Sequence, residues 1–407
     1  MTQAIFFDDG RGLLSPLTDL RAAFNIRTGA LTTIDRWMLR NGMDAVGLFV
    51  PEPLAALTAE CHPGVSVNQP LRDASGSGAV LAINGRCVLP LPAALGLAVG
   101  ECIIESSSGH LVAACVPHAD VPALAARGWM PHGLHATSPT DHVLLERPWH
   151  IRAFRDAALD IDLPLLVAAI ATVAAPPQAI VIPGHALTIA KSAKVYPGVI
   201  LDTEAGPIVI DEHAVIRPGA SIVGPAYIGP HSTVLDRALI KARTAIGPWC
   251  KVAGEVGGTI FQGFANKGHD GHLGDSWVGE WANLGAGTTN SNLLNTYGEV
   301  TCRAFHLTGE PGQNERTGQQ FLGAVIGDHV KTAICTRLMT GCIVGTGSML
   351  AASAAAVGTI ERFSWCTDAG IKPFRHDKFI EVAAAAMARR KVAPSAAYMA
   401  RLAALVR

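Results

Sequence analysis

The sequence predicts two kinds of structure in one chain: an α/β domain at the amino terminus, then an all-β left-handed parallel β-helix built from hexapeptide repeats, with helices at the carboxyl end. Two observations predict this architecture. An aliphatic residue recurs at every sixth position over a long central stretch, and the preceding region alternates short apolar runs with helical segments. The 407 residues also exceed one ordinary core, so two or three domains are expected.

The spacing of six fits neither an α-helix, with a period of 3.6, nor an exposed strand, with a period of 2. It fits a coil with three short sides, each turning one aliphatic side chain inward, and about eighteen residues to the turn. Stacked coils would satisfy each other's backbone groups as parallel strands do. The aliphatic positions are Ile210, Ile216, Ile222, Ile228, Val234, Ile240, Ile246 and Val252.

The repeat assigns residues 181–372 to the β-helix, with the rhythm resuming at Val278 and again at Ile326. Residues 254–277 and 290–323 interrupt it, and both are expected to be loops thrown out from the scaffold. Loops carried on a rigid scaffold are common locations for function.

Residues 1–145 are predicted to form the α/β domain, because short apolar strands alternate with segments of helical character. Residues 146–180, with Pro148 and Pro176-Pro177, read as a helical linker, and Ala-rich residues 373–407 as helices that flank the β-helix. The expected elements of the first domain are strands Ala4–Phe7, Ala45–Val50 and Ala79–Asn84 and a helical stretch over Arg21–Asn41.

Composition excludes several classes of protein. The formal net charge is -1 and charged residues make up only 16%, so the basic excess of a nucleic-acid-binding protein is absent. Nine scattered cysteines without a CxxC pair form neither a disulfide framework nor a zinc cluster. The sequence shows neither a signal peptide nor an apolar run long enough to span a bilayer, so we expect a cytoplasmic protein without membrane or nucleic-acid partners.

The densest polar cluster is residues 266–275, in the first interruption of the repeat. Acyl transfer to an amine needs a base with a pKa near neutrality, which makes His269 or His272 the candidate. Asp270 or Asp275 could orient its imidazole. An equally good interpretation is that these residues hydrogen-bond the backbone at a break in the coil.

A second polar segment covers residues 283–292 and reads Asn-Leu-Gly-Ala-Gly-Thr-Thr-Asn-Ser-Asn. Its Gly and Ala residues would let a ligand approach the backbone, and its Asn side chains could hold sugar hydroxyls. Taken alone, a tight turn that demands small residues is the better interpretation.

The text GHDGHLGDSWVGEWANLGAGTTNSN resembles the acetyltransferase segment of the bifunctional N-acetylglucosamine-1-phosphate uridylyltransferase/glucosamine-1-phosphate acetyltransferase family. The resemblance implies a homotrimer that shares active sites between neighbouring β-helices, with acetyl-CoA as acyl donor. It further implies a catalytic base at His269, a substrate contact at His272, a sugar-site residue at Asn283, acetyl-CoA contacts at Ala286 and Gly287, and a loop asparagine at Asn292.

The chain departs from that family in its phosphate clamp. The family's paired lysines fall here near Gly257-Gly258, where no cation stands. Lys241, Arg243, Lys251 or Lys267 could substitute, although each reads as easily as an exposed basic residue. The second interruption is also much longer than in the family, so the acceptor need not be glucosamine 1-phosphate.

The opening residues 7–18 are similar to those of sugar-1-phosphate nucleotidylyltransferases, where a Gly-rich loop wraps a nucleoside triphosphate with backbone N–H groups. Gly10-Arg11-Gly12 and Pro16-Leu17-Thr18 match. The family's Thr-Arg pair is replaced by Leu13-Leu14, its lysine position falls near Ala23, and its metal-binding aspartate is missing around Asn84-Gly85-Arg86. Mg²⁺ would be needed only if this domain is active.

The whole chain is most similar to a divergent branch of sugar nucleotidyltransferase proteins. That branch shares the Phe-Asp-Asp start, the Lys-Gly-His-Asp-Gly segment and a terminal Met-Ala-Arg-Arg, here Met387–Arg390. Arg11, Arg21 and Arg27 are candidates for binding the phosphates of a nucleotide, because arginine suits bidentate phosphate binding. Ordinary surface arginines are an equal alternative.

Three functions follow. The first is a transferase acting on a sugar phosphate or nucleotide sugar, with N-acyl transfer on the β-helix and nucleotidylyl transfer or nucleotide binding in the first domain. The second is a metal-dependent lyase or hydrolase, in which His269 and His272 hold zinc with a histidine such as His231 or His329 of a neighbouring subunit. The third is a non-catalytic protein that binds nucleotide sugars.

Overall fold

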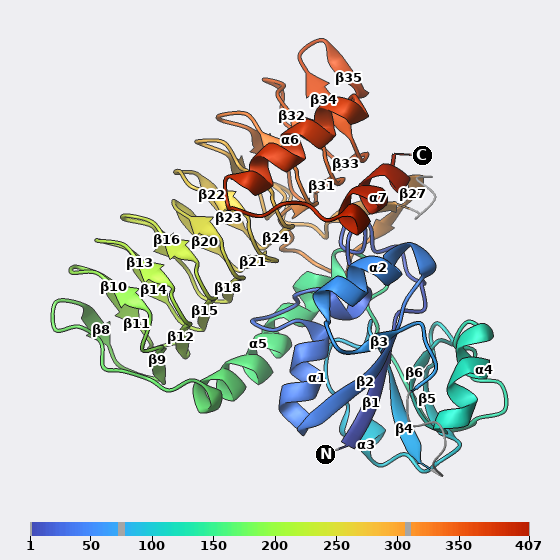
Figure 1. Ribbon diagram of the computed structural model, residues 1–407. Helices are drawn as coiled ribbons and strands as arrows, with labels where there is room; N and C mark the ends of the chain where they lie inside the picture. Colours follow the sequence, from blue (N-terminus) through green and yellow to red (C-terminus); the bar gives the residue numbers. More distant parts are fainter. Residues whose placement is uncertain (1, 72–77, 306–310, 407) are drawn as a thin grey trace. The chain divides into compact units, whose positions relative to one another are not determined.

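The computed structural model describes residues 2–71, 78–305 and 311–406, which form two compact units. The first unit contains Met1–Gly12, Leu20–Ile26 and Leu31–Arg147. The second unit contains Leu13–Asp19, Arg27–Ala30 and Pro148–Arg407, so two short segments from the amino-terminal region belong to it. Figure 1 shows the mixed α/β structure of the first unit and the stacked coils of the second.

The first unit is built on a seven-stranded sheet of order β3-β2-β1-β4-β6-β5-β7. Strands β1 to β4 are parallel, whereas β6 runs antiparallel to both β4 and β5. The strands are β1 (Thr2–Phe7), β2 (Met43–Phe49), β3 (Ser66–Val67), β4 (Ala79–Asn84), β5 (Glu101–Glu105), β6 (Leu111–Pro117) and β7 (His135–Thr140). The helices are η1 (Ala23–Asn25), α1 (Thr33–Asn41), α2 (Glu52–Cys61), α3 (Pro92–Leu95), η2 (His118–Asp120) and α4 (Val121–Ala126).

Strand β1 is buried on both faces. Ala4 and Phe6 belong to one apolar cluster, and Ile5 and Phe7 belong to another. Alternate side chains of a strand point to opposite faces, so both faces of this sheet are covered. The three strands expected from the sequence are confirmed as β2, β1 and β4, which are consecutive neighbours in the sheet.

The helix expected over residues 21–41 is much shorter in the structure. Helix α1 begins at Thr33, because the Thr32 hydroxyl caps it by accepting a hydrogen bond from the Asp35 amide at 3.3 Å. The preceding residues 21–32 contain a single 3₁₀ turn at Ala23–Asn25 and are otherwise mostly bends.

The second unit is a parallel β-helix with three faces, which confirms the fold class predicted from the sequence. The β23 face contains β8 (Ile180–Ile182), β11 (Ile200–Asp202), β14 (Ser221–Val223), β17 (Leu239–Ile240), β20 (Glu255–Gly257) and β23 (His272–Gly274). The β24 face contains β9 (Leu187–Ile189), β12 (Ile208–Ile210), β15 (Ala226–Ile228), β18 (Thr244–Ile246), β21 (Ile260–Phe261), β24 (Trp277–Val278), β28 (Val325–Ile326), β31 (Ile343–Val344) and β33 (Thr359–Ile360).

The third face, the β22 face, continues through a single-residue bridge. Asn283 pairs with Asn266 on one side and with Lys331 on the other, which joins two groups of strands. The first group is β10 (Lys194–Val195), β13 (Val215–Ile216), β16 (Thr233–Val234), β19 (Lys251–Val252) and β22 (Asn266–Lys267). The second group is β29 (Lys331–Thr332), β32 (Met349–Leu350), β34 (Ser364–Thr367) and the antiparallel β35 (Gly370–Pro373).

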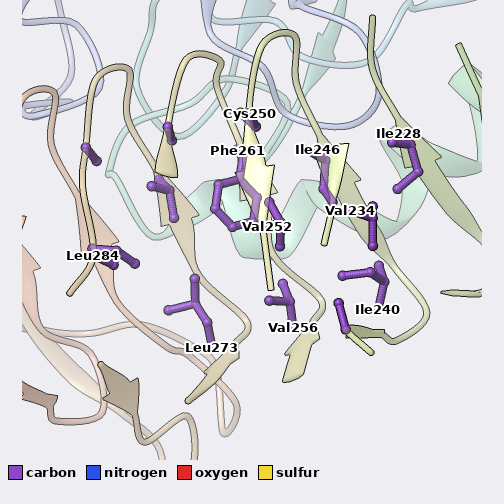
Figure 2. Packing of buried hydrophobic residues seen from close by; sticks show 14 of the residues in the cluster. Ile228, Val234, Ile240, Ile246, Cys250, Val252, Val256, Phe261, Leu273 and Leu284 are labelled. Atoms are coloured by element: carbon purple, nitrogen blue, oxygen red, sulfur yellow. The ribbon is translucent and has the colours of Figure 1, made fainter. Parts of the chain in front are cut away.

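The interior of the β-helix is filled by the aliphatic residues of the repeat. Ile228, Val234, Ile240, Ile246 and Val252 are fully buried and lie in one cluster, as Figure 2 shows. Burial of each such side chain stabilises the fold by about 1.5–3 kcal/mol relative to exposure.

The first expected interruption, residues 254–277, is not a loop. It contains the regular strands β20, β21, β22 and β23. The rhythm of six fails because the coil is shortened: Val234 pairs with Val252, 18 residues on, but Val252 pairs with Lys267, only 15 residues on. Lys267 consequently occupies an inward position that aliphatic residues hold in the preceding coils.

The second expected interruption is confirmed as a loop. It leaves after β25 (Thr289–Asn290), which pairs with β30 (Arg337–Leu338), and contains a hairpin of β26 (Thr301–Phe305) and β27 (Pro311–Arg316). The second unit also contains the helices α5 (His150–Ala169), α6 (His376–Ala388) and α7 (Ala396–Ala404). The expected linker is thus mostly helix α5, which belongs to the second unit. Among the described residues, no helix combines the length and apolar character that crossing a bilayer requires.

Candidate functional site

The candidate site begins at Lys267, whose side chain is only 1% exposed. Its Nζ donates hydrogen bonds to the backbone oxygens of Ala253 (3.2 Å), His269 (3.0 Å) and Asp270 (3.1 Å). Burial lowers the pKa of Lys267 to about 8, partly offset by the charge of Asp270. All three donors are used, so Lys267 holds the 268–271 turn in place and is not available to a substrate phosphate.

The turn that Lys267 holds exposes the side chains of His269 and Asp270. Neither side chain makes a hydrogen bond or ion pair with the described part of the chain. Asp270 therefore does not orient the imidazole of His269 within one subunit. Fixing His269 would require a substrate or a second copy of the chain.

His272 lies in a row of charged side chains on the β23 face. Its Nδ1 lies 3.4 Å from Oε1 of Glu255, and Lys241 Nζ donates to the same oxygen at 3.2 Å. The row follows from register, because Glu255 and His272 are cross-strand partners on β20 and β23. The pKa of Glu255 lies below its usual value, chiefly because Lys241 donates a hydrogen bond to the carboxylate. Burial opposes this effect, and the charge of His272 adds to it.

The other imidazole nitrogen of His272 lies over a glycine. A methyl group at position 274 would lie 2.7 Å from His272 Nε2 and 2.9 Å from Asn292 Nδ2. Asn292 is fixed there by donating to Asp275 Oδ2 at 2.8 Å. Gly274 thus makes room for an imidazole and an amide to converge, and His272 has the polar surroundings expected of a general base.

Asp275 also anchors helix α5 to the β-helix. Its Oδ1 lies 2.8 Å from Arg152 Nε and 2.7 Å from Arg155 NH1. Arg155 is almost buried and donates a further hydrogen bond to the backbone oxygen of Gly258 at 2.5 Å. Two arginines of α5 therefore lie near Gly257-Gly258, the position at which the resembled family has its pair of lysines.

The remaining β-helix candidates lie apart from His272. Asn283 is on the β22 face, where its Oδ1 accepts a hydrogen bond from Asn266 Nδ2 at 2.7 Å. Ala286 and Gly287 form a corner stacked on the next coil, with the Cys335 amide donating to the Ala286 oxygen at 2.6 Å. Arg243 pairs with Asp160 of helix α5. One subunit therefore does not bring Asn283, Ala286 and His272 onto a single face.

Backbone amides of the Gly-rich loop in the first unit donate hydrogen bonds to the carboxylates of neighbouring aspartates. Asp8 Oδ1 accepts a hydrogen bond from the Gly10 amide at 2.9 Å, and Asp9 Oδ1 accepts one from the Arg11 amide at 3.1 Å. Gly10 and Gly12 take positive φ angles of 65° and 80°, which glycine adopts readily. Two amides that could face a phosphate are therefore already bonded within the loop.

Arg86 supplies a buried cation next to this loop. Its Nε and NH2 bind both carboxylate oxygens of Asp9 at 2.9 and 2.8 Å, and it also pairs with Glu146. Asn84 Nδ2 donates to Asp9 as well, at 3.0 Å. Burial alone would raise the pKa of Asp9, but the Arg86 guanidinium more than offsets this and the pKa lies below its usual value. Both oxygens of Asp9 are occupied, so these residues do not fit a Mg²⁺ ion.

The three arginines expected to bind phosphate lie in different places. Arg11 is partly buried and its NH2 lies 2.9 Å from Met130 Sδ, while Arg21 is buried in the first unit. Arg27 belongs to the second unit, where its amide donates to Gln262 Oε1 at 2.8 Å and its Nε to the Gln262 oxygen at 3.3 Å. Arg27 is thus committed to a structural contact.

The histidines considered as zinc ligands belong to an aromatic stack along one corner of the β-helix. His231 stacks between His213 and Trp249, and His329 Nε2 lies 2.7 Å from the Tyr398 hydroxyl. The described residues contain no group of three or more His, Cys, Asp or Glu side chains arranged to hold a metal. All nine cysteines are free thiols.

Comparison with known proteins confirms the resemblance for part of the chain. Residues 4–169 match the family described as sugar nucleotidyl transferase. The "Bifunctional protein GlmU" of Methanococcus vannielii is 31% identical over 140 residues, which is 34% of this chain and 31% of the relative. The "Bifunctional sugar-1-phosphate nucleotidylyltransferase/acetyltransferase" of Sulfurisphaera tokodaii is 31% identical over 146 residues, 34% of each chain. The match thus spans about a third of these relatives.

Sequence reasoning missed Glu255, Arg86 and the two arginines of α5. Glu255 could have been found from the register, because it stands one coil before His272 on the same strand position once the shortened coil is recognised. In the sequence, Arg86 stands near the position where the resembled family has its metal-binding aspartate. Arg86 and Asp9 lie just beyond the ends of the neighbouring parallel strands β4 and β1, and the spacing of the sequence alone does not show that these strands are neighbours.

Proposed function

We propose that the second unit transfers an acyl group from acetyl-CoA to the amine of a sugar phosphate or nucleotide sugar. The observation that carries this proposal is the pairing of His272 with Glu255, together with an open Nε2 beside Asn292. An imidazole oriented by a carboxylate can remove the amine proton as the nitrogen attacks the thioester, and the thiolate of CoA then leaves. The names of the partial relatives support the same chemistry.

The proposed base is His272, with His269 as the alternative that the family resemblance implies. Asn292 would hold a sugar hydroxyl, and Arg152, the more exposed of the two α5 arginines, would take over part of the missing phosphate clamp. A homotrimer would place the exposed His269 of one subunit, with Asn283 and the Ala286 corner, against the β23 face of another. A cytoplasmic location and acetyl-CoA as the particular donor belong to this proposal.

The experiment is acetyl-CoA turnover with amino-sugar 1-phosphates and with UDP-linked amino sugars, followed by release of the CoA thiol. Loss of activity in His272→Gln with retention in His269→Gln supports His272 as base. The reverse pattern assigns the base to His269. Unchanged turnover in both variants removes the acyl-transfer proposal for this site.

For the first unit we propose nucleotidyl transfer or nucleotide binding, which the family match over residues 4–169 supports. Both oxygens of Asp9 are bonded to Arg86 and Asn84 and do not fit a Mg²⁺ ion, which favours binding over turnover. Pyrophosphate release from a nucleoside triphosphate and a sugar 1-phosphate, with and without Mg²⁺, separates the two. Calorimetric binding without pyrophosphate release assigns this unit to binding.

A further inference from the structure

A cavity of about 220 Å³ lies in the second unit against the β22 face, away from the β23 face that carries His272. Its floor is a column of four outward side chains: Lys251, Asn266, Asn283 and Lys331. They are consecutive cross-strand partners, so adjacent members are about 4.8 Å apart in the stacking direction. The column has a cation at each end and two hydrogen-bonded amides in the middle.

Helix α6 supplies two more cations to the same cavity. Arg389 and Arg390 directly follow the last residue of α6, Ala388, and both line the cavity. The apolar wall is formed by Phe264 and Trp281, whose rings stack at 4.5 Å and 20°. Four basic side chains from two separate structural elements therefore converge on one small volume.

These four charges are not balanced by the protein. No acidic residue lines the cavity, in a chain with 32 basic and 33 acidic residues. The side chains of Lys251, Arg389 and Arg390 have no hydrogen-bond or ion-pair partner in the described part of the chain. Lys331 has one long hydrogen bond, 3.5 Å to the Trp281 oxygen. Burial, and then the charge of Arg389, lower the pKa of Lys331 to about 8.

A favourable interaction with the helix dipole would explain only two of the four cations that line the cavity. Cations are favourable at a helix carboxyl terminus, where they interact with the helix dipole, and this suits Arg389 and Arg390. It does not account for Lys251 and Lys331, which come from strands of the β-helix. Clustering four like charges without an anion is unfavourable, so a bound anion would relieve it.

We propose that this cavity binds the phosphate or pyrophosphate group of a small-molecule ligand. Arginine offers a planar fork that matches phosphate oxygens, and the lysines add point charges on the floor. The paired amides of Asn266 and Asn283 supply neutral polar groups next to the charges. The volume is smaller than a typical drug-sized site, so the cavity takes a compact ligand or the phosphate end of a longer one.

The test is isothermal titration calorimetry of the full chain with pyrophosphate as the probe. The double variant Arg389→Gln/Arg390→Gln should weaken binding by roughly tenfold or more, since it removes the charge-assisted, bidentate hydrogen bonds that arginine makes to phosphate. Arg389→Lys/Arg390→Lys, which keeps the charge but not the fork, should lose less. The matched control is Arg375→Gln/Lys378→Gln, at the other end of the same helix, where both residues are exposed and paired with acids.

The control should bind pyrophosphate within about twofold of the unchanged protein. Equal weakening in both double variants, or no saturable binding, overturns the proposal. ADP, CoA and glucosamine 1-phosphate, titrated next, distinguish nucleotide from sugar-phosphate sources of the same group. Asn283 also belongs to the shared site of the proposed function, but the inference of phosphate binding rests on the four cations of the cavity. His272→Gln should therefore retain pyrophosphate binding even when turnover is lost.

Discussion

Nδ1 of the His272 imidazole lies 3.4 Å from Oε1 of Glu255, the residue that precedes it by one coil on the β23 face. The contact is set by the register of two parallel strands, so it does not depend on a flexible loop. The opposite ring nitrogen lies above the backbone of Gly274 and beside Asn292. This leaves one nitrogen oriented and the other available for a substrate proton.

Replacing His272 should abolish most acyl transfer. A positioned general base contributes about 10²–10⁴-fold, so His272→Gln should lower kcat by at least about a hundredfold with a smaller effect on KM. The measurement is steady-state release of CoA thiol. His213→Gln, an exposed histidine in the aromatic stack, is the control and should leave kcat unchanged. A similar decrease in both variants would argue against a specific role for His272.

A methyl group at position 274 should damage activity more than stability. In Gly274→Ala the new carbon would stand 2.7 Å from His272 Nε2 and must displace the ring or Asn292, both of which are side chains able to move. We expect a decrease of roughly tenfold or more in kcat/KM, with a change in unfolding free energy of about 1 kcal/mol. Gly298→Ala, whose added carbon meets only Thr296 Oγ1 at 3.5 Å, should change neither quantity.

Lys267→Met should destabilise the second unit by about 2 kcal/mol at pH 7, because three backbone oxygens lose their charged donor. The pKa of Lys267 in the folded chain is about 8, below its value in the unfolded chain. The unfolded state therefore binds more protons between pH 8 and 10.5, and the stability of the unchanged protein rises with pH in that window. Urea unfolding across this range should show a smaller rise in the variant, while Lys251→Met should behave as the unchanged protein.

Removing Arg86 should destabilise the first unit by about 3–5 kcal/mol, because Asp9 would become a buried carboxylate without a counter-charge. The pKa of Asp9 is held down in the folded state, so its contribution to stability is present at neutral pH and is lost as pH falls through that lowered value. Arg86→Met/Asp9→Asn should recover part of the loss. Thermal unfolding of both variants checks the coupling, and simple additivity would contradict it.

Phosphate binding in the α6 cavity should take up protons. The pKa of Lys331 is about 8 without a ligand, where its charge is opposed by burial and by Arg389, with Lys251 and Arg390 also facing the cavity. A bound anion favours the charged amine and raises this pKa, so affinity for pyrophosphate should fall as pH rises above 8. Calorimetry at pH 8.5 in buffers of different ionisation enthalpy measures the proton uptake, which Lys331→Met should remove.

The repeat made the β-helix predictable, because one side chain in six is forced inward and nothing else in the chain competes with that pattern. The residues around Glu255 were wrongly predicted to form a loop, because the coil is three residues shorter there. The shorter coil shifts the spacing of the inward residues, although the strands continue. Lys267, a polar residue, occupies an inward position in the same coil, so the sequence of that coil looks like a loop. A register count that allowed shortened coils would have recovered both residues.

The candidate site was less predictable than the fold. His272 and Asn292 were both named from the sequence, and the structure brings them together over Gly274. Glu255 was not named, and Asn283 lies on a different face. Arg86 and Asp9 are 77 positions apart in the sequence. Their contact depends on the length and direction of the two side chains, which cannot be predicted from the periodicity or spacing of residues.

The assignment of residues 13–19 and 27–30 to the second unit bears on how the protein can be dissected. Asp19 is fully buried and lies 2.8 Å from Arg362, so a fragment starting at Pro148 would retain the guanidinium without its carboxylate. Such a truncation should be insoluble or need the amino-terminal peptide added back in trans. During synthesis, Asp19 must wait until almost the last coil of the β-helix has been made before it can pair with Arg362.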